Sequence, residues 1–309
     1  MELRHLRYFI AVAEAGSLSL AAQTRLRTAQ PSLSRQIRAL EREIGTRLLE
    51  RKARGVELTP AGRVFLDHAR LVLLQVEAAR DAALRAARPE KMSFVLGFLT
   101  GQEMIWLPET LRILQDVMPA TELMVLSASS PELTEDLVRG TVDAAFVRKD
   151  ERAPGLAYRL VAREPVVVLM ARDHPLAARR AIAPRDLAKQ PLIRPSRVAP
   201  ALSAAIDAYA ERHGIRLKAV NEVDDLAMAI SLLASTKAVG LVSNYVESLL
   251  PPTVVSRPLQ GDAPVMELYL GYNKANTSAV LKRLLSKVDG LVARVSETRR
   301  PPPPRKITS

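Results

Sequence analysis

The chain has 309 residues, a net charge of +12 at pH 7 and a hydrophobic content of 48%. This length suits two or three compact domains, and the positive charge favours acidic partners, with nucleic acid ahead of a membrane surface. The absence of cysteine excludes disulfides, thiolate catalysis and zinc fingers, and the lack of a secretion signal or an apolar run of roughly 18 residues predicts a soluble cytoplasmic protein.

The first 60 residues are basic and have a helical pattern. They contain 11 lysines and arginines against 6 acidic residues, a net charge of +5. A first helix is predicted by apolar residues at spacings of one, three and four: Leu6, Phe9, Ile10 and Ala13. A second helix begins at "GSLSLAAQTRL" with Ser17 as its N-cap, and a third begins at "TAQPS" with Pro31 in its first turn.

The predicted third helix has an apolar face and a cationic face. Its apolar stripe is Leu33, Ile37, Leu40 and Ile44. At about 100° per residue, the opposite side carries Pro31, Ser34, Arg35, Arg38 and Arg42. After Gly45, "TRLLERKARGVEL" predicts two short strands joined by a basic turn. Three helices followed by a basic hairpin indicate a winged helix-turn-helix, which we assign to residues 1–58.

A long helix is predicted next, over residues 59–89, with Thr59 as its cap and Pro60 in its first turn. Apolar residues recur along it at alternating steps of four and three: Phe65, Ala69, Val72, Val76, Ala79 and Ala83. This spacing is typical of a coiled-coil seam, and we interpret these six residues as a dimerisation surface. The alternative is that the stripe packs against the chain's own body.

From residue 91 the pattern changes to strands that alternate with helices. "FVLGFL", "LMVLS" and "VDAAFV" have the character of buried strands, with helical segments between them. A second set of strands and helices follows from "VVVLM" to "VGLVS", and "MELYLGY" with a final helix completes the body. This alternation predicts an α/β fold with parallel βαβ units. The Pro-rich residues 296–309 are predicted to be a disordered tail.

With these elements in order, the chain resembles the LysR-type transcriptional regulators. The N-terminal part resembles them through "LRYFIAVAEAGSLSLAAQ", "TAQPSLSRQIRALEREIGTRLLER" and "LTPAG". The remainder resembles them through "LGFL", "LVRGTVDAAFV", "RDHPLA" and "VGLVS", and the opening "MELRHLRYF" is similar to regulators of aromatic-compound catabolism. The chain departs from the family between Ala22 and Gln30, where it has one extra residue, which we expect in the turn between two helices. Ala29 also stands where the family usually has Ser or Thr.

The resemblance implies a winged helix-turn-helix, a long linker helix and a two-lobed effector domain like that of periplasmic binding proteins. Lobe I would span residues 90–162, completed by residues 266–295, and lobe II would span residues 163–265. The hinge is expected near residues 159–164 and 263–267. The resemblance further implies a homodimer or homotetramer that acts on promoter DNA and on RNA polymerase.

DNA contacts are predicted from the third helix and the wing. Gln30 can bond an adenine edge, and Arg35 and Arg38 can bond guanine or phosphate in the major groove. The resemblance assigns base or phosphate contacts to Gln30, Pro31, Ser34, Arg35 and Arg54. The helix and wing geometry adds Arg38, Arg51 and Lys52. Arg42 and Arg47 are interpreted as surface or salt-bridge residues.

A carboxylate effector is predicted from the ends of the strands in the α/β body. Hydroxyl side chains at Thr100, Ser129, Ser130 and Ser196 follow predicted strands, and helix N-termini favour anions. Each serine can instead be a simple N-cap, and Arg148 can meet either a carboxylate ligand or Glu164. The resemblance places Thr100, Ser129, Ser130, Arg148, Pro195 and Leu202 in the cleft, and Glu164 and Ser196 complete the predicted set. An aromatic carboxylate or its ring-cleavage product is the expected effector, with no other cofactor and no metal.

Two other functions are weighed against an effector-controlled regulator. An enzyme would need catalytic motifs, but the sequence has no GxSxG, GxGxxG, P-loop or HExxH, and its four histidines are scattered. A DNA-binding protein without an effector would have no need of a two-lobed body. We therefore predict a DNA-binding regulator and no catalytic residues.

Overall fold

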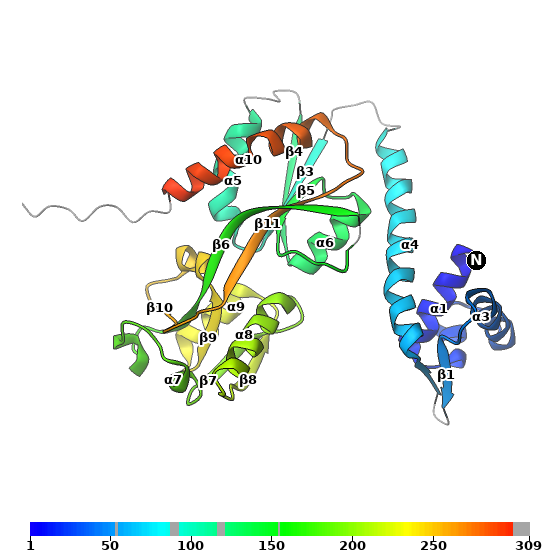
Figure 1. Ribbon diagram of the computed structural model, residues 1–309, viewed down its shortest axis with the longest axis horizontal. Helices are drawn as coiled ribbons and strands as arrows, with labels where there is room; N and C mark the ends of the chain where they lie inside the picture. Colours follow the sequence, from blue (N-terminus) through cyan, green and yellow to red (C-terminus); the bar gives the residue numbers. More distant parts are fainter. Residues whose placement is uncertain (53–54, 87–92, 116–120, 154, 299–309) are drawn as a thin grey trace, which may run out of the picture. The chain divides into compact units, whose positions relative to one another are not determined.

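The structure, a computed structural model, describes residues 1–52, 55–86, 93–115, 121–153 and 155–298 (Figure 1). The chain divides into two compact units, Met1–Arg88 and Pro89–Ser309. Arg54 and the predicted tail beyond residue 298 lie outside the described residues, and so does the side chain of Arg51.

The N-terminal unit is the predicted winged helix-turn-helix, continued by a long helix. A two-stranded antiparallel hairpin follows the third helix and forms the wing, with Leu49 paired to Leu58. Ser17 caps the second helix as predicted, because its Oγ accepts a hydrogen bond from the Leu20 amide. The elements of this unit are α1 (Leu3–Ala15), α2 (Leu18–Leu20), the π-helical turn η1 (Ala21–Arg25), α3 (Gln30–Ile44), β1 (Leu49–Lys52), β2 (Gly55–Leu58) and α4 (Pro60–Ala86).

The second helix continues into a π-helical turn, η1. The Leu26 amide bonds to the Ala21 carbonyl, five residues back, where an α-helix would join residues four apart. Arg27 then adopts a left-handed conformation with φ of 45° in the turn that leads to α3. That the extra residue lies in the turn between the two helices stays a prediction.

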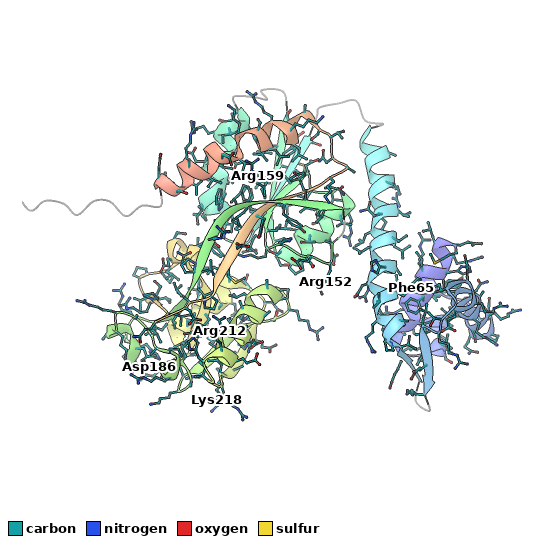
Figure 2. The ribbon with its side chains drawn as sticks, in the orientation of Figure 1. Phe65, Arg152, Arg159, Asp186, Arg212 and Lys218 are labelled. Atoms are coloured by element: carbon teal, nitrogen blue, oxygen red, sulfur yellow. The ribbon has the colours of Figure 1, made fainter. Side chains whose placement is uncertain are left out.

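The first turns of α4 belong to the core of the N-terminal unit. The ring of Phe65 packs edge-on against Phe9 of α1 with centroids 5.1 Å apart, and Ala69 is only 2% exposed (Figure 2). Ala69 is buried in the chain's own core, which corrects its prediction as a dimer contact, whereas Phe65 is only partly buried and its dimer contact stays a prediction. Val72 is 43% exposed, and Ala79 and Ala83 are also exposed, so the remainder of the stripe stays available for a partner.

The C-terminal unit is built on one mixed sheet with strand order β4-β3-β5-β11-β6-β9-β7-β8, and β10 pairs with β6. β3 lies parallel to β4 and β5, whereas β11 runs antiparallel to β5 and β6. The strands are β3 (Ser93–Leu99), β4 (Glu122–Ala128), β5 (Ala144–Val147), β6 (Leu156–Ala171), β7 (Pro191–Pro195), β8 (Lys218–Val223), β9 (Val239–Ser243), β10 (Val254–Pro258) and β11 (Val265–Asn273). The helices are α5 (Glu103–Gln115), α6 (Ser130–Arg139), η2 (Pro175–Ala178), α7 (Pro184–Leu187), α8 (Pro200–Arg212), α9 (Leu226–Ser235), η3 (Asn244–Leu249) and α10 (Ala279–Thr298).

The long strand β6 joins two lobes with separate hydrophobic cores (Figure 1). Its residues up to Pro165 pair with β11, and its residues from Val166 onward pair with β9 and β10. We call the part around β3, β4, β5 and β11 lobe I, and the part around β7, β8, β9 and β10 lobe II. Lobe I has an aromatic core in which Phe146 stacks between Phe98 and Trp106, at centroid distances of 5.0 Å and 5.1 Å.

Helix α5 begins at Glu103, shortly after the end of β3. Pro108 therefore lies inside the helix, where it cannot donate a backbone hydrogen bond. This start matters because it brings Gln102 and Trp106 to the end of β3, one helical turn apart. Both side chains are buried and belong to the polar network described below.

Candidate DNA interface and interlobe pocket

The exposed face of α3 carries the amide and cationic groups that the sequence predicts. Gln30, Pro31, Arg35 and Arg38 are all exposed, while Leu33, Ile37 and Leu40 are buried in the unit's core. Pro31 occupies the first turn, where its missing N–H is not needed. The helix thus presents an N-terminal half with the donors and acceptors that base edges and phosphates require.

Ser34 does not lie on this face, which corrects the prediction. It is 4% exposed, and its Oγ accepts a hydrogen bond from Nη2 of Arg38 at 3.3 Å. Arg38 also donates through Nε to the Ser34 carbonyl. Ser34 therefore helps to position the Arg38 guanidinium, and its own side chain is not exposed for contact with DNA.

The wing and the end of α3 supply further positive charge. Lys52 on β1 is exposed, and its contact with Glu50 raises the pKa of its ammonium group. Arg42 and Arg47 are exposed, as expected of surface residues, and they line a hollow together with Arg35 and Arg38. This places a run of four arginines along one side of the unit.

The C-terminal unit has a pocket of about 590 Å³ between its lobes. It lies at the carboxyl ends of strands from both lobes, where ligands of open α/β sheets bind. Thr100, Ser130 and Arg148 line it from lobe I, and Pro195, Leu202 and Asp224 line it from lobe II. Its volume suits a small organic molecule.

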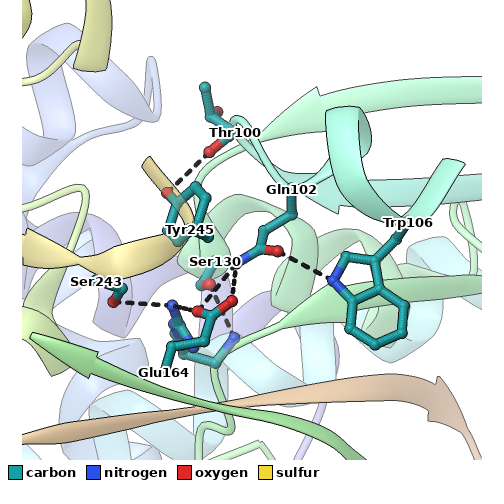
Figure 3. A network of polar contacts seen from close by, with 8 residues as sticks. Thr100, Gln102, Trp106, Ser130, Glu164, Ser243 and Tyr245 are labelled. Carbon is teal, nitrogen blue, oxygen red and sulfur yellow. Dashed lines mark hydrogen bonds and ion pairs between the residues drawn. The ribbon is translucent and has the colours of Figure 1, made fainter. Parts of the chain in front are cut away.

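A buried polar network forms one wall of this pocket (Figure 3). Glu164 of β6 is 0% exposed, and both of its carboxylate oxygens accept hydrogen bonds from the Gln102 amide, at 3.0 Å and 3.1 Å. Arg148 donates from Nη2 to the same carboxylate at 2.7 Å. The Oε1 atom of Gln102 accepts a bond from the Trp106 indole, so the buried charges are paired and their partners are held in turn.

Arg148 follows β5 and connects the two lobes. Its Nη2 donates to Ser243 of lobe II at 3.1 Å, and its backbone amide donates to Ser130 at the start of α6. Its Nη1 is buried and has no hydrogen-bond partner in the described part of the chain. A buried donor without a partner costs about 1–3 kcal/mol, so this atom favours any acceptor that enters the pocket.

A second hydrogen bond between the lobes joins Tyr245 to lobe I. The Tyr245 hydroxyl donates to the Thr100 carbonyl at 3.0 Å, and burial raises the pKa of this phenol to about 12. Gly101 has a φ of +89°, and a Cβ there would lie 2.8 Å from Leu249 and 3.0 Å from the Tyr245 ring. Glycine at this position therefore allows lobe II to pack directly onto the end of β3.

Ser129 has the simple structural role that was the alternative to ligand binding. It is the N-cap of α6: its Oγ accepts from the Glu132 amide, and its own amide donates to the Glu132 carboxylate. Hydrogen bonding of the Glu132 carboxylate to the side chain and the backbone amide of Ser129 lowers the pKa of Glu132. Ser129 still lines the pocket, but its polar groups are already committed to the helix end.

Comparison with known proteins gives the family of this architecture. The model of the LysR substrate binding domain matches residues 87–289, and that of the bacterial regulatory helix-turn-helix protein of the lysR family matches residues 3–63. The chain belongs to the LysR family of transcriptional regulators. Proteins of this family bind DNA and are not enzymes. The predictions of a DNA-binding regulator and of a protein that is not an enzyme are therefore confirmed.

Full-length relatives support this membership. The transcriptional regulator AlsR of Bacillus subtilis is 32% identical, with 92% of this chain and 94% of that protein covered. BenM of Acinetobacter baylyi is 30% identical, with coverage of 95% and 97%. The solved structure of full-length CbnR complexed with its target DNA is similar at a TM-score of 0.56 and 28% identity, over 94% of this chain and all of that one.

Two predicted residues of this LysR-family pocket do not line it. Glu164 lies behind Arg148, as the salt-bridge alternative proposed, and Ser196 donates its hydroxyl to Asp224. The other predicted positions, Thr100, Ser129, Ser130, Arg148, Pro195 and Leu202, do line the pocket. No helix in the described part of the regulator is long and apolar enough to cross a membrane.

Most other residues that line the pocket were not predicted from the sequence, among them Arg194, Asp224 and Tyr245. Asp224 directly follows β8, so the rule applied to the other strand ends would have included it. Arg194 lies within a strand, and Tyr245 reaches lobe I through tertiary packing, which no local pattern indicates.

Proposed function

We propose that this regulator is controlled by a small carboxylate that binds between the two lobes, with an aromatic acid or its ring-cleavage product as the preferred class. The unpartnered Nη1 of Arg148 carries this proposal, because it is a buried cationic donor at the wall of a pocket of suitable size. The N-terminus of α6 adds a partial positive charge beside it.

The body of the effector would lie against apolar side chains. Leu99, Ile193, Val198, Leu202 and Val242 all line the pocket, so a ring or a flat conjugated chain would be surrounded by aliphatic groups from both lobes. Burial of such a body contributes about 25 cal/mol for each Å² removed from water. A carboxylate at one end would then fix the orientation of the molecule.

Binding would be coupled to lobe arrangement through Arg148. This residue belongs to lobe I, yet it bonds to Ser243 of lobe II and to Glu164 on the strand shared by both. A ligand that adds a bond to Arg148 in one lobe arrangement shifts the population toward it. We further propose that the protein acts in the cytoplasm as a homodimer or homotetramer, so that this shift alters the spacing of its DNA-binding units and access for RNA polymerase.

The proposal is tested by comparing acids with their uncharged amides. Thermal unfolding of the whole protein would be followed with benzoate, benzamide, cis,cis-muconate and its diamide, each at millimolar concentration. We expect an acid to raise the melting temperature, by an amount that corresponds to about 2.7 kcal/mol at 100 times its Kd, and its amide to have no effect. Equal effects of acid and amide, or no effect of any acid, would contradict the proposal.

The one tryptophan of the chain provides a second readout. Trp106 is joined through Gln102 to the carboxylate that holds Arg148, so a ligand on Arg148 should change its fluorescence. Saturation of this change by the acid and not by the amide would show that the acid binds at Arg148.

A further inference from the structure

The charged residues that line the pocket differ between its two lobes. Lobe I contributes Arg148, Lys149 and Arg152 together with the carboxylates Glu132 and Asp150. Glu132 is bonded to Ser129, Lys149 pairs with Glu151 and Asp150 pairs with Arg152, whereas Nη1 of Arg148 has no partner in the described part of the chain. Lobe II contributes two adjacent carboxylates, Asp224 and Asp225, and one cation, Arg194. The lobe I side is therefore suited to an anion, whereas the lobe II side is suited to a group that donates hydrogen bonds.

Arg194 does not offset this asymmetry, because it is already paired. Its Nη1 lies 2.7 Å from the carboxylate of Asp207 on α8, and this contact is the main cause of its raised pKa. Glu222 stands opposite Arg194 in the β7–β8 register and adds to the same effect. The positive charge of Arg194 is thus neutralised from within lobe II.

The Asp225 carboxylate is engaged in capping its own helix, so Asp224 is the carboxylate of the two that can bind a ligand. The Asp225 carboxylate caps α9 by accepting from the Met228 amide at 2.7 Å. Asp224 accepts the Ser196 hydroxyl on Oδ1, and the Ser196 amide bonds to the Val223 carbonyl, which fixes Ser196 beside it. The Oδ2 of Asp224 accepts no hydrogen bond from a described residue, so it can receive one from a ligand.

We propose that the effector carries a hydroxyl or amino group as well as its carboxylate, and that Asp224 is the residue that selects it. This inference rests on the proposed function, since it assumes that the carboxylate lies at Arg148. Asp224 is exposed, and a carboxylate can only accept hydrogen bonds, so an effector that ends in a bare ring or methyl group would displace water from its Oδ2 without replacing the hydrogen bond. An effector with a donor at that end satisfies both lobes at once.

The test compares matched ligands on the full-length protein by isothermal titration calorimetry. The probes are benzoate, 3- and 4-hydroxybenzoate, 4-(aminomethyl)benzoate, hexanoate and 6-hydroxyhexanoate. We expect at least one donor-bearing acid to bind about tenfold more tightly than its parent acid, as a hydrogen bond to a charged group would give. In Asp224→Ala this preference should disappear, and the parent acid should bind at least as tightly as it does to the wild type, because no carboxylate is left without a partner.

Glu222→Ala is the matched control. It removes the same charge from lobe II two residues away, but Glu222 does not line the pocket, so the preference should persist. Asp224→Asn separates the two donors: a hydroxyl acid should keep most of its advantage through the Asn oxygen, whereas an ammonium acid should lose it. Melting temperatures without ligand would show that each variant is folded.

The outcomes separate the two proposals. If parent acids bind and no donor improves affinity, or if the preference survives in Asp224→Ala, the assignment of Asp224 is wrong and the carboxylate site stands. If none of these acids binds to the wild-type protein, the carboxylate proposal fails and the inference about Asp224 fails with it.

Discussion

The carboxylate of Glu164 illustrates how strongly a single residue can depend on its surroundings. It is completely buried on β6, and its charge is tolerated because Arg148 and Gln102 donate three hydrogen bonds to it. A buried ion pair is not by itself a source of stability, but the loss of one partner leaves the other charge uncompensated. Arg148 bonds to Glu164 on β6 and to Ser243 of lobe II, so the packing of the two lobes depends on this ion pair.

We predict that Glu164→Ala lowers the free energy of unfolding of the C-terminal unit by about 3–5 kcal/mol, because Arg148 would be left buried without its counter-ion. Urea denaturation of the full-length protein measures this. Glu135→Ala is the control, since it breaks the exposed i,i+4 pair of Glu135 with Arg139 and should cost under about 1 kcal/mol. Similar losses in the two variants would show that burial of the pair is unimportant.

Predictions for single residues succeeded where a local sequence rule fixes the position of the side chain, and they failed where tertiary packing fixes it. The strand-end rule placed Thr100, Ser130 and Arg148 at the pocket. An ideal rotation of 100° per residue put Ser34 at the edge of the cationic face, but the neighbouring elements of the N-terminal unit cover it. Tyr245 could not be predicted, because its bond to Thr100 joins residues 145 positions apart.

Among the elements, α3 carries the predicted DNA contacts, and its N-terminus has no side-chain cap. Its N-cap residue, Ala29, has extended backbone geometry suited to a cap, but no side-chain oxygen to bond the first amides. The second residue of the helix is Pro31, which has no amide, so the Ser32 amide is the one that a capping side chain would reach. The helix that presents Gln30 and Arg35 thus begins without a side-chain cap.

We predict that Ala29→Ser stabilises the start of α3 by about 1 kcal/mol, because the new hydroxyl can accept from the Ser32 amide. Hydrogen exchange of the α3 amides in the full-length protein should slow by about fivefold. Ala39→Ser, in the middle of the same helix, should instead destabilise it slightly, since serine is a poorer helix former than alanine. Unchanged exchange in Ala29→Ser would mean that this helix end is satisfied in another way.

Element boundaries were predicted well where capping residues mark them and poorly elsewhere. The wing hairpin, α6 and α9 all lie where turn and cap residues place them, with Ser129 and Asp225 acting as caps. The first half of β6 was missed as a strand, since Pro165 interrupts its pattern at the point where its pairing partner changes. The π-helical turn at Ala21–Arg25 was not predicted, because no local residue pattern indicates it.

At the scale of the whole molecule, a specific DNA site requires more contacts than one winged helix-turn-helix supplies, so self-association is central. The outer part of α4 provides an apolar stripe that the N-terminal unit leaves exposed, including Val72, Ala79 and Ala83. Small side chains at this spacing allow two helices to approach closely. Because Ala69 is buried and Phe65 packs on Phe9, the surface that stays available lies mainly in the residues beyond them.

We predict that Val72→Glu combined with Ala79→Glu weakens self-association at least tenfold, because the two carboxylates would be buried against each other between paired helices. Analytical ultracentrifugation over a range of concentrations measures this. Glu77→Arg, on the opposite side of α4, is the control and should leave the association unchanged. If the double variant associates like the wild type, the stripe on α4 is not the contact.

The most direct test of the account is a footprint on the DNA upstream of the protein's own coding region, with the wild type compared with Arg35→Ala and Arg42→Ala. Arg35 lies in the N-terminal half of α3, which we place against base edges, while Arg42 lies near its other end. We expect the wild type and Arg42→Ala to protect the same discrete segment, and Arg35→Ala to lose that protection while its oligomeric state is kept. Undiminished protection by Arg35→Ala would contradict the placement of α3 on DNA.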